Sequence, residues 1–448
     1  MTRRRSLAAP LAVLFIGVGI LFSGSLLEWV IFPSGTIVGT ARRELALNIV
    51  RGLAIAGGLY LALRRPRLTV IHLAAAALGA AFAAILGALV LQVGYNPPPL
   101  ASGWKAFAPS HEWNELGFRG RRITYTPEDY VVLLLGDSQV EATAVRLDEM
   151  PEQRLEAHLK SVGRSARVFS VGAGAYGQDQ ELLALQQYFT KYRADLVILW
   201  QTPVNDIWNN VFKTHMASRN PKPTFWLDAS QNLCGPSEQL GQPLANSPIV
   251  VVSMWQRLFG LPWRDKSWEN ALPEPYTPLS SYDGSVRTEW QERWKTNAGR
   301  MRDENLATEK SHLAVALSPR SKRMQYGIDL THALVRRINE VVNAQGGKLV
   351  IFQVENEELV PQGEDVYALN GKYYRVSRRQ YYGNWSAVNQ GFDTVTVPVT
   401  VRDWRVGPTD AHLNAQATNQ VMRDLAVQLG ARISEAGHDP GCCPAMSR

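Results

Sequence analysis

The sequence is poor in cysteine, and its few cysteines form no recognisable framework. Only three occur among 448 residues: Cys234, Cys442 and Cys443. This number and spacing exclude a disulfide-rich scaffold and a zinc site of the usual Cys/His spacing. Two interpretations stay open. One is a single bridge from Cys234 to either C-terminal cysteine in an oxidising compartment, and the other is unpaired thiols without a role.

Motifs for metals and nucleotides are also lacking. The eight histidines are scattered, no HExxH motif occurs, and there is no Walker loop. The glycine-rich stretch GAGAYG at 172–177 lacks the spacing of a dinucleotide fingerprint. We therefore expect chemistry that needs neither a metal nor a cofactor.

Charged residues are few, at 19%, and the net charge of +7 comes from the N-terminal part of the chain. The first 67 residues hold nine arginines and two acids, an excess equal to the whole net charge, and residues 68–100 hold no charged side chain. The remainder of the chain is balanced. A neutral domain has no global field to attract phosphate backbones, so nucleic-acid binding is excluded as a leading function.

Three apolar stretches precede residue 100, at 7–27, 45–63 and 68–95. Their length and composition predict about three transmembrane helices, the first an uncleaved signal anchor, with residues 1–100 as a membrane anchor and the bilayer as a partner. With three crossings the basic turn at 64–67 faces the cytoplasm, and residues 101–448 lie outside it. The predicted location is a bacterial inner membrane, with the large domain facing the periplasm or the exterior. Two crossings would leave that domain in the cytoplasm.

From residue 130 onward, apolar strand patterns alternate with helical periodicity. This alternation predicts an α/β fold, with a parallel sheet covered by helices on both faces. The expected strands are 130–136, 166–172, 195–200, 348–354 and 392–399, and the expected helices are 151–162, 179–192, 329–344 and 414–429.

Polar motifs follow these strands where reactive groups gather in parallel sheets, at the carboxyl edge. They are Gly-Asp-Ser at 136–138, the glycine-rich turn at 172–177, Asn-Asp at 205–206 and Asp-Ala-His at 410–412. Each alone is typical of a turn or a helix cap. In this order, each after a predicted element, they indicate one site.

Here the chain resembles the SGNH (GDSL-type) hydrolase family, in a membrane-anchored bacterial form. The four motifs carry the resemblance, together with NELGFRG at 114–120 and DAHLN at 410–414. It covers roughly 114–206 and 324–430 and leaves a Trp-rich insertion at about 207–323. The resemblance implies a flavodoxin-like three-layer fold.

The resemblance also implies roles for particular residues. Ser138 would be the nucleophile, His412 its general base and Asp410 the residue that orients the imidazole, with Asp403 as a reserve acid. The oxyanion hole would consist of the Ser138 N–H, a backbone N–H of Gly174 or Ala175, and the Asn205 side chain. Asp137 and Asp206 would brace the loops. Two departures from the family pattern are Ala175 where glycine is usual and Asp-x-His in place of Asp-x-x-His.

The expected function is a serine esterase or O-acyltransferase. It would act through an acyl-serine on acyl esters, above all acetyl esters, of a cell-envelope or exported polysaccharide. The alternative is a catalytically silent scaffold or binding protein of the same fold in an envelope assembly. The tryptophans of the insertion suit either a glycan-binding lid or the packing of a subdomain.

Overall fold

A computed structural model describes residues 7–21, 41–64, 70–72, 74, 78–79, 112–213, 222–237, 267–288, 305–355, 360–369, 371–407 and 410–435. The described elements fall into two compact units. Helices α1 (Ala8–Leu21) and α3 (Ala41–Arg64) belong to one unit, and all strands and helices from residue 131 onward belong to the other.

In the first unit, α1 and α3 pack closely against each other. Gly19 and Gly58 lie at the contact, because a Cβ atom on Gly19 would meet Ile55 at 2.6 Å and one on Gly58 would meet Ile16 at 2.6 Å. Arg51 Nε donates a hydrogen bond of 3.1 Å to the carbonyl of Gly19.

The prediction of N-terminal transmembrane helices was wrong. Within the described ranges, no helix combines the length and the apolar character needed to cross a membrane. Helix α1 is apolar but has 14 residues, about 21 Å at the rise of an α-helix, against a hydrocarbon core of about 30 Å. Helix α3 has 24 residues but carries Arg42, Arg43, Glu44, Arg51 and Arg64.

Most of the third expected span, 68–95, lies outside the described residues. The bilayer as a partner and the location outside the cytoplasm stay predictions from the sequence alone.

The second unit is built on a five-stranded parallel sheet with the order β2-β1-β3-β6-β9, which confirms the expected α/β architecture. In order along the chain these strands occupy positions 2-1-3-4-5, the flavodoxin-like order. Their bounds are β1 (Val131–Gly136), β2 (Arg167–Gly172), β3 (Leu196–Gln201), β6 (Lys348–Glu355) and β9 (Thr394–Pro398).

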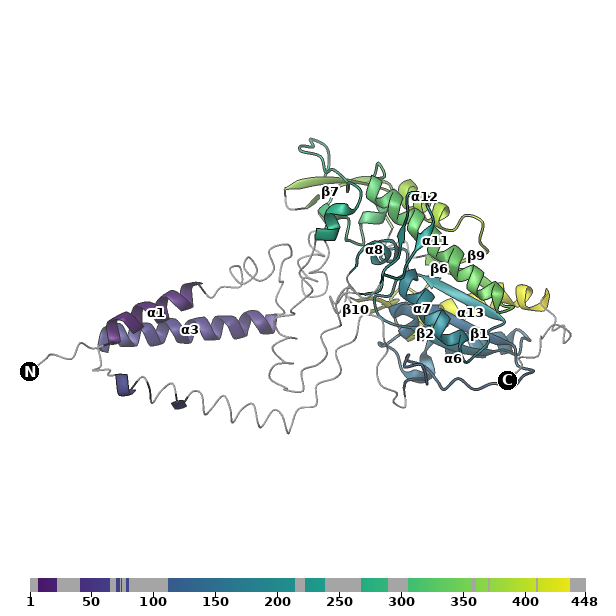
Figure 1. Ribbon diagram of the computed structural model, residues 1–448, viewed down its shortest axis with the longest axis horizontal. Coiled ribbons are helices and arrows are strands. Elements are labelled where there is room, and N and C mark those ends of the chain that lie inside the picture. The colour runs from purple at the N-terminus through teal and green to yellow at the C-terminus, as the bar shows by residue number, and fades with distance from the viewer. Residues whose placement is uncertain are drawn as a thin grey trace, which may run out of the picture. The chain divides into compact units, whose positions relative to one another are not determined.

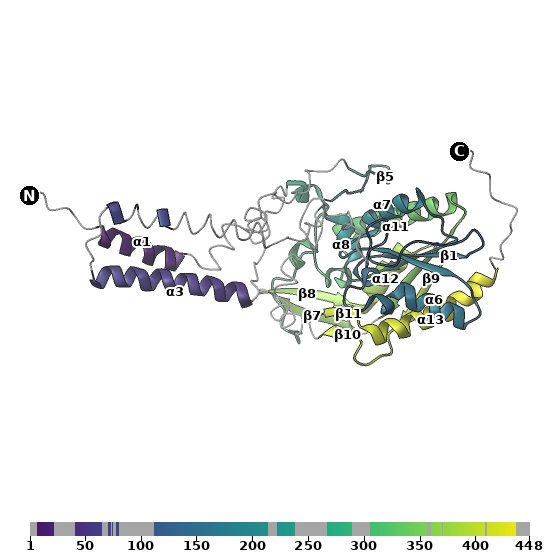
Figure 2. The ribbon, with the colours of Figure 1, turned by 90° about the horizontal axis from the view of Figure 1, so that it is seen from below.

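Helices cover both faces of the sheet, as Figures 1 and 2 show. Helices α6 (Pro151–Ser161) and α13 (Ala415–Glu435) lie on one face, with α7 (Gln178–Phe189) and α11 (Lys322–Ala344) on the other. Successive side chains of β1 enter alternate cores, because strand side chains point to opposite faces. Leu133 and Leu135 pack with α7 and α11, whereas Val132 and Leu134 pack with α6 and α13.

Shorter elements surround the carboxyl ends of the strands. They are helices α5 (Ser138–Glu141), α8 (Asp206–Val211) and α12 (Arg378–Val388), the 3₁₀ helices η1 (Leu147–Glu149), η2 (Ser267–Ala271), η3 (Leu306–Thr308) and η4 (Ala314–Ala316), and the antiparallel pairs β4–β5 (Trp226–Leu227, Leu233–Cys234), β7–β8 (Glu364–Leu369, Lys372–Ser377) and β10–β11 (Arg405–Gly407, Asp410–Leu413).

The tryptophans in the described part of the insertion differ in their surroundings: two pack with an aromatic neighbour and one is exposed. Trp208 is buried and packs with Phe212, and the ring of Trp268 lies 5.9 Å from that of Phe212. Trp226 has an exposed fraction of 44%. Cys234 is a free thiol within the described ranges, and Cys442 and Cys443 fall outside them.

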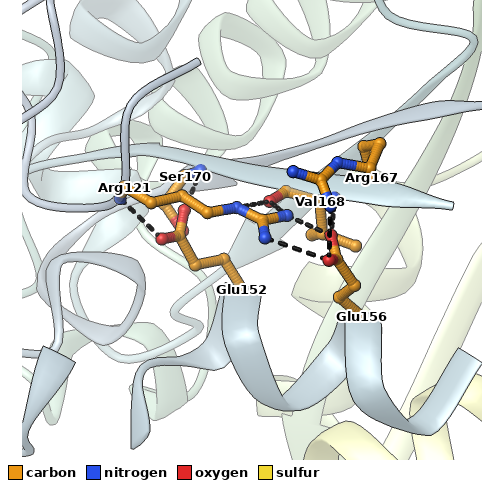
Figure 3. A network of polar contacts seen from close by, with 6 residues as sticks. All are labelled: Arg121, Glu152, Glu156, Arg167, Val168 and Ser170. Atoms are coloured by element: carbon orange, nitrogen blue, oxygen red, sulfur yellow. Dashed lines mark hydrogen bonds and ion pairs between the residues drawn. The ribbon is translucent and has the colours of Figure 1, made fainter. Parts of the chain in front are cut away.

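Side chains form hydrogen bonds with the outward-facing backbone groups of β2, which is an edge strand of the sheet. The carboxylate of Glu152 accepts hydrogen bonds from the N–H groups of Arg121 and Ser170, at 2.8 and 2.7 Å. Glu156 accepts from the N–H of Val168 at 2.8 Å and from the guanidinium of Arg121 (Figure 3). Because buried backbone groups need partners, this network fixes the segment after NELGFRG against the sheet.

Candidate active site

Ser138 begins helix α5, directly after strand β1. Asp137 precedes it as the N-cap, and its Oδ1 accepts a hydrogen bond of 2.9 Å from the N–H of Gln139. The strands must end in glycine here, because a Cβ on Gly136 or Gly172 would come within 2.7 Å of the Val140 side chain. Because these two glycines have no Cβ, helix α5 packs directly on the ends of the strands, and Ser138 lies above those ends.

Ser138, His412 and Asp410 form a continuous hydrogen-bonded chain. The Nε2 atom of His412 lies 2.8 Å from Ser138 Oγ, and its Nδ1 lies 2.5 Å from Asp410 Oδ1. The side chain of Asp410 is 19% exposed and that of His412 is 40% exposed. A carboxylate on Nδ1 holds the imidazole in the tautomer whose Nε2 is free to accept a proton.

The hairpin β10–β11 holds the histidine in place. Asp410 and His412 both lie on β11, which pairs with β10 in antiparallel fashion. The N–H of Leu413 donates a hydrogen bond of 3.4 Å to Gln139 Oε1, which links this strand to the residue after Ser138. The reserve acid, Asp403, uses its backbone carbonyl to accept from the Asn414 side chain. The carboxylate that contacts the imidazole is that of Asp410.

The glycine-rich turn distinguishes between its two candidate donors. The N–H of Gly174 donates a hydrogen bond of 2.7 Å to Glu141 Oε2, so this group is already occupied. Ala175 adopts a left-handed backbone conformation with a φ of 62°, and it is 4% exposed. Such a conformation strains any residue with a Cβ and is concentrated at functional sites. Of the two, the Ala175 N–H is the better placed candidate donor.

Asn205 lies at the end of the loop after β3, and its side chain points toward the serine loop. Its Nδ2 donates to Asp137 Oδ2 at 3.3 Å, and the residue is 5% exposed. The loop itself is held by Trp385 of α12, whose Nε1 donates a hydrogen bond of 3.1 Å to the carbonyl of Pro203. An Asn amide has two N–H bonds, so one remains to meet a substrate oxygen.

Buried carboxyl groups lie beneath the strand ends. Asp206 accepts from Gln178 Nε2 at 2.7 Å and from the N–H of Thr202 at 2.9 Å. Burial, and next the neighbouring Asp137, raise the pKa of Asp206 well above its ordinary value. Burial likewise raises the pKa values of Asp137 and Glu181. Asp137 and Asp206 accept hydrogen bonds from loop residues, and burial favours the neutral form of all three carboxyl groups.

The sequence analysis assigned no role to two residues that support the site. Glu141 is the last residue of α5 and binds the glycine-rich turn, as described above. Arg119, 5% exposed, donates to the carbonyls of Glu141, Ala142 and Val145 beyond the end of α5. A helix end leaves carbonyls without partners, and Arg119 supplies the missing donors. The only sequence signal for Arg119 was its place in NELGFRG; Glu141 gave none.

The described residues contain no group of three or more His, Cys, Asp or Glu side chains arranged to hold a metal ion. The arrangement of Ser138, His412 and Asp410 instead supports nucleophilic chemistry by a serine hydroxyl.

Comparisons with known proteins find distant structural neighbours. No protein-family model and no curated protein sequence matches the chain. An acetyl xylan esterase from the rumen bacterium Butyrivibrio proteoclasticus is 8% identical, with a TM-score of 0.28, over 70% of this chain and 66% of the esterase. A GDP-L-fucose synthetase from Naegleria fowleri bound to NADP is 12% identical, with a TM-score of 0.19, over 70% of this chain and 97% of the synthetase.

Proposed function

We propose that this protein is a serine esterase or O-acyltransferase of the SGNH (GDSL-type) hydrolase family. The observation that carries the proposal is the hydrogen-bonded chain from Ser138 Oγ through His412 to Asp410. Ser138 lies near the start of the domain, and Asp410 and His412 lie near its end. Their hydroxyl, imidazole and carboxylate groups are nevertheless hydrogen-bonded in the order that acyl transfer to a serine requires.

In the first half of the reaction, Ser138 Oγ attacks the carbonyl carbon of an ester. His412 Nε2 takes the hydroxyl proton as the new C–O bond forms, and Asp410 stabilises the resulting imidazolium. The tetrahedral intermediate then breaks its bond to the alcohol oxygen. The proton passes from Nε2 to that oxygen, the alcohol leaves, and the acyl group stays on Ser138.

The developing oxyanion needs donors that are fixed before the reaction. The N–H groups of Ser138 and Ala175 and the Asn205 amide are the proposed three donors. Each such donor contributes about 10²–10³ in rate in well-studied cases. In this assignment Gly174 has a supporting part, because its N–H binds Glu141.

In the second half, an incoming hydroxyl group gives its proton to His412 and attacks the acyl-serine. The bond between the acyl carbon and Ser138 Oγ then breaks, and the proton passes from Nε2 to Oγ, which restores the serine hydroxyl. If the hydroxyl is water, the protein is an esterase, and if it belongs to a sugar, the protein is an acyltransferase. The proposed substrate is an acyl ester of a polysaccharide. Incubation with an acetyl donor and a glycan acceptor separates the two reactions, because only transfer yields acetylated glycan.

Labelling with a serine-reactive fluorophosphonate tests the proposal. We expect stoichiometric labelling of the wild type at Ser138, located by peptide mass spectrometry, and none of Ser138→Ala. The matched control is Ser161→Ala, at an exposed serine on α6, which should label like the wild type. Equal labelling of wild type and Ser138→Ala, or none of either, would favour the silent scaffold.

A further inference from the structure

Arg119 holds the C-terminal end of helix α5 through backbone carbonyls. Its Nη1 donates to the carbonyls of Glu141 and Ala142, and its Nη2 donates to that of Val145 at 2.9 Å. Its Nε donates to Glu112 Oε2 at 3.5 Å. Each nitrogen of this buried guanidinium therefore has a partner in the folded domain, and the side chain is held in one position.

Helix α5 is too short to hold its own shape. It has four residues, and a single helical turn does not recover the cost of nucleation. Ala142 closes the helix in a left-handed conformation with a φ of 47°, and its N–H donates a hydrogen bond of 2.9 Å to the carbonyl of Ser138. This conformation costs energy in a residue with a Cβ. Arg119 binds the carbonyl of the same residue and so stabilises the turn next to the nucleophile.

Glu141 joins this end of the helix to the glycine-rich turn. Arg119 binds its backbone carbonyl at 3.3 Å, and its carboxylate accepts from the N–H of Gly174. The residue after Gly174 is Ala175, the better placed of the two candidate oxyanion donors. A shift of Glu141 would therefore move the turn as well as the helix.

The residue before Arg119 contacts the same turn. The ring of Phe118 meets that of Tyr176 edge-on, with centroids 6.3 Å apart, and both residues are buried. Tyr176 directly follows Ala175. Asn114 fixes the segment, because its Oδ1 accepts from the N–H of Phe118 at 3.1 Å and its Nδ2 donates to a carbonyl of strand β2. Neighbouring residues of one segment thus contact both loops that supply the proposed backbone donors.

We propose that Arg119 is a positioning residue of the oxyanion hole, which fixes the end of α5 and, through Glu141, the turn that presents the Ala175 N–H. This inference rests on the proposed function, because it concerns the donors of the same site. The guanidinium acts on the protein backbone and has no part in binding the substrate. Its removal should therefore weaken binding of the transition state much more than binding of the ground state.

Release of p-nitrophenol from p-nitrophenyl acetate by the full chain tests the proposal. Arg119→Ala should lower kcat by about 10- to 100-fold and change KM by less than about threefold, because misplaced donors stabilise the transition state poorly. Arg119→Lys should lower kcat by about tenfold, since one ammonium nitrogen cannot replace the fork of Nη1 and Nη2. A folded Arg119→Lys variant with the wild-type kcat would overturn the proposal even if Arg119→Ala does not fold.

Active-site titration separates positioning from partial unfolding. Fluorophosphonate should label Ser138 of Arg119→Ala to the same final stoichiometry as wild type, but more slowly, because every molecule has a complete but misaligned site. If the labelled fraction falls in proportion to kcat while the rate constant per labelled site is unchanged, Arg119 only keeps the domain folded. That result would overturn the positioning role.

Arg121 provides the matched control in the same segment. Its side chain is 17% exposed against 6% for Arg119, and it binds the Val168 carbonyl and Glu156 at the edge of the sheet (Figure 3). Arg121→Ala removes comparable contacts away from α5, so it should lower the melting temperature but keep kcat within about threefold of wild type. An equal loss of kcat in both alanine variants would assign the effect to the stability of the segment and overturn the proposal.

The double variant Arg119→Ala/Glu141→Leu tests the route through Glu141. If Arg119 acts through Glu141, the double variant should lose no more than about threefold beyond the more damaging single variant, because residues that act through one contact are not additive. Multiplication of the two single losses would show independent actions and exclude this route.

The outcomes keep the two proposals apart. A wild type that hydrolyses the ester and labels at Ser138, with an Arg119→Ala variant of equal kcat, overturns the positioning role and leaves the esterase standing. A wild type that neither releases p-nitrophenol nor labels contradicts the proposed function, and the positioning role with it.

Discussion

The carboxylate of Glu141 accepts a hydrogen bond of 2.7 Å from the backbone N–H of Gly174. Glu141 ends the short helix that Ser138 begins, and Gly174 precedes Ala175 in the glycine-rich turn. The bond therefore fixes the distance between the nucleophile and its proposed oxyanion donor. Burial raises the pKa of Glu141, whereas this hydrogen bond and the nearby Arg119 lower it.

Replacing Glu141 by leucine should lower kcat for ester hydrolysis by about 10- to 100-fold and change KM much less, because a misplaced donor weakens binding of the transition state alone. Glu141→Gln keeps an acceptor oxygen and should retain activity within about threefold of wild type. Glutamine and leucine variants with the same deficit would show that the hydrogen bond to Gly174 is not the reason for the loss.

Asp410→Asn should lower kcat by about 10³–10⁴, because the asparagine amide would donate to His412 Nδ1 and leave Nε2 protonated and unable to accept from Ser138. Steady-state kinetics on a p-nitrophenyl ester measure the loss. Asp403→Asn is the matched control and should stay close to wild type. A larger deficit in Asp403→Asn than in Asp410→Asn would transfer the orienting role to Asp403.

Asn205→Ala should lower kcat by about 10²–10³ with little change in KM, as expected for a donor that acts mainly in the transition state. Thermal denaturation shows whether the loss of the contact with Asp137 also destabilises the fold. Asn232→Ala, at an exposed turn, serves as the control. A rise in KM at unchanged kcat would mean that Asn205 binds the substrate ground state instead.

Stability should depend on pH through Glu152, which Figure 3 shows beside β2. Burial raises the pKa of Glu152 from 4.5 to about 7. The folded state then holds a proton that the unfolded state releases between these values, so the contribution is full below about pH 4.5 and is lost as pH rises through 7. Relative to Glu152→Gln, the unfolding free energy of wild type should fall by about 3 kcal/mol across this window.

Urea denaturation of both proteins from pH 4.5 to 8 measures this difference. Glu156→Gln provides a control of opposite sign. Partial burial raises the pKa of Glu156, but hydrogen bonds from Arg121 and Val168 outweigh it and lower the pKa, so its contribution is lost as pH falls. Parallel curves for wild type and Glu152→Gln would show that Glu152 does not titrate in this range.

The parallel sheet was predictable because its strands are buried on both faces and appear as continuous apolar runs, such as Val131–Gly136. Boundaries were less predictable. Helix α11 begins at Lys322, ahead of the expected 329, because the Ser321 side chain accepts from the N–H of Met324 and caps it. The transmembrane prediction was wrong at α3 because the apolar run at 45–63 falls within a longer helix, Ala41–Arg64, that carries several charged residues.

The site was predictable to the extent that its residues follow strand ends. The sequence left Gly174 and Ala175 as alternatives, because the choice depends on a backbone angle and on a contact from Glu141, which lies 33 positions away. Arg119 and Trp385 act on loops through backbone carbonyls, and such contacts leave no pattern in the residues of the loop. These supporting contacts can be identified only from the folded structure, because they join segments that are far apart in the sequence.

The side chains along the outer backbone of β2 also affect how the molecule meets other copies of itself. An uncovered strand is a template on which a further chain can pair, and this is a common start of sheet-to-sheet aggregation. Asn114 Nδ2 and Arg121 occupy the carbonyls of Ser170 and Val168, and Glu152 and Glu156 occupy the N–H groups. On this side the sheet therefore cannot grow, and oligomers built by strand addition would have to form elsewhere.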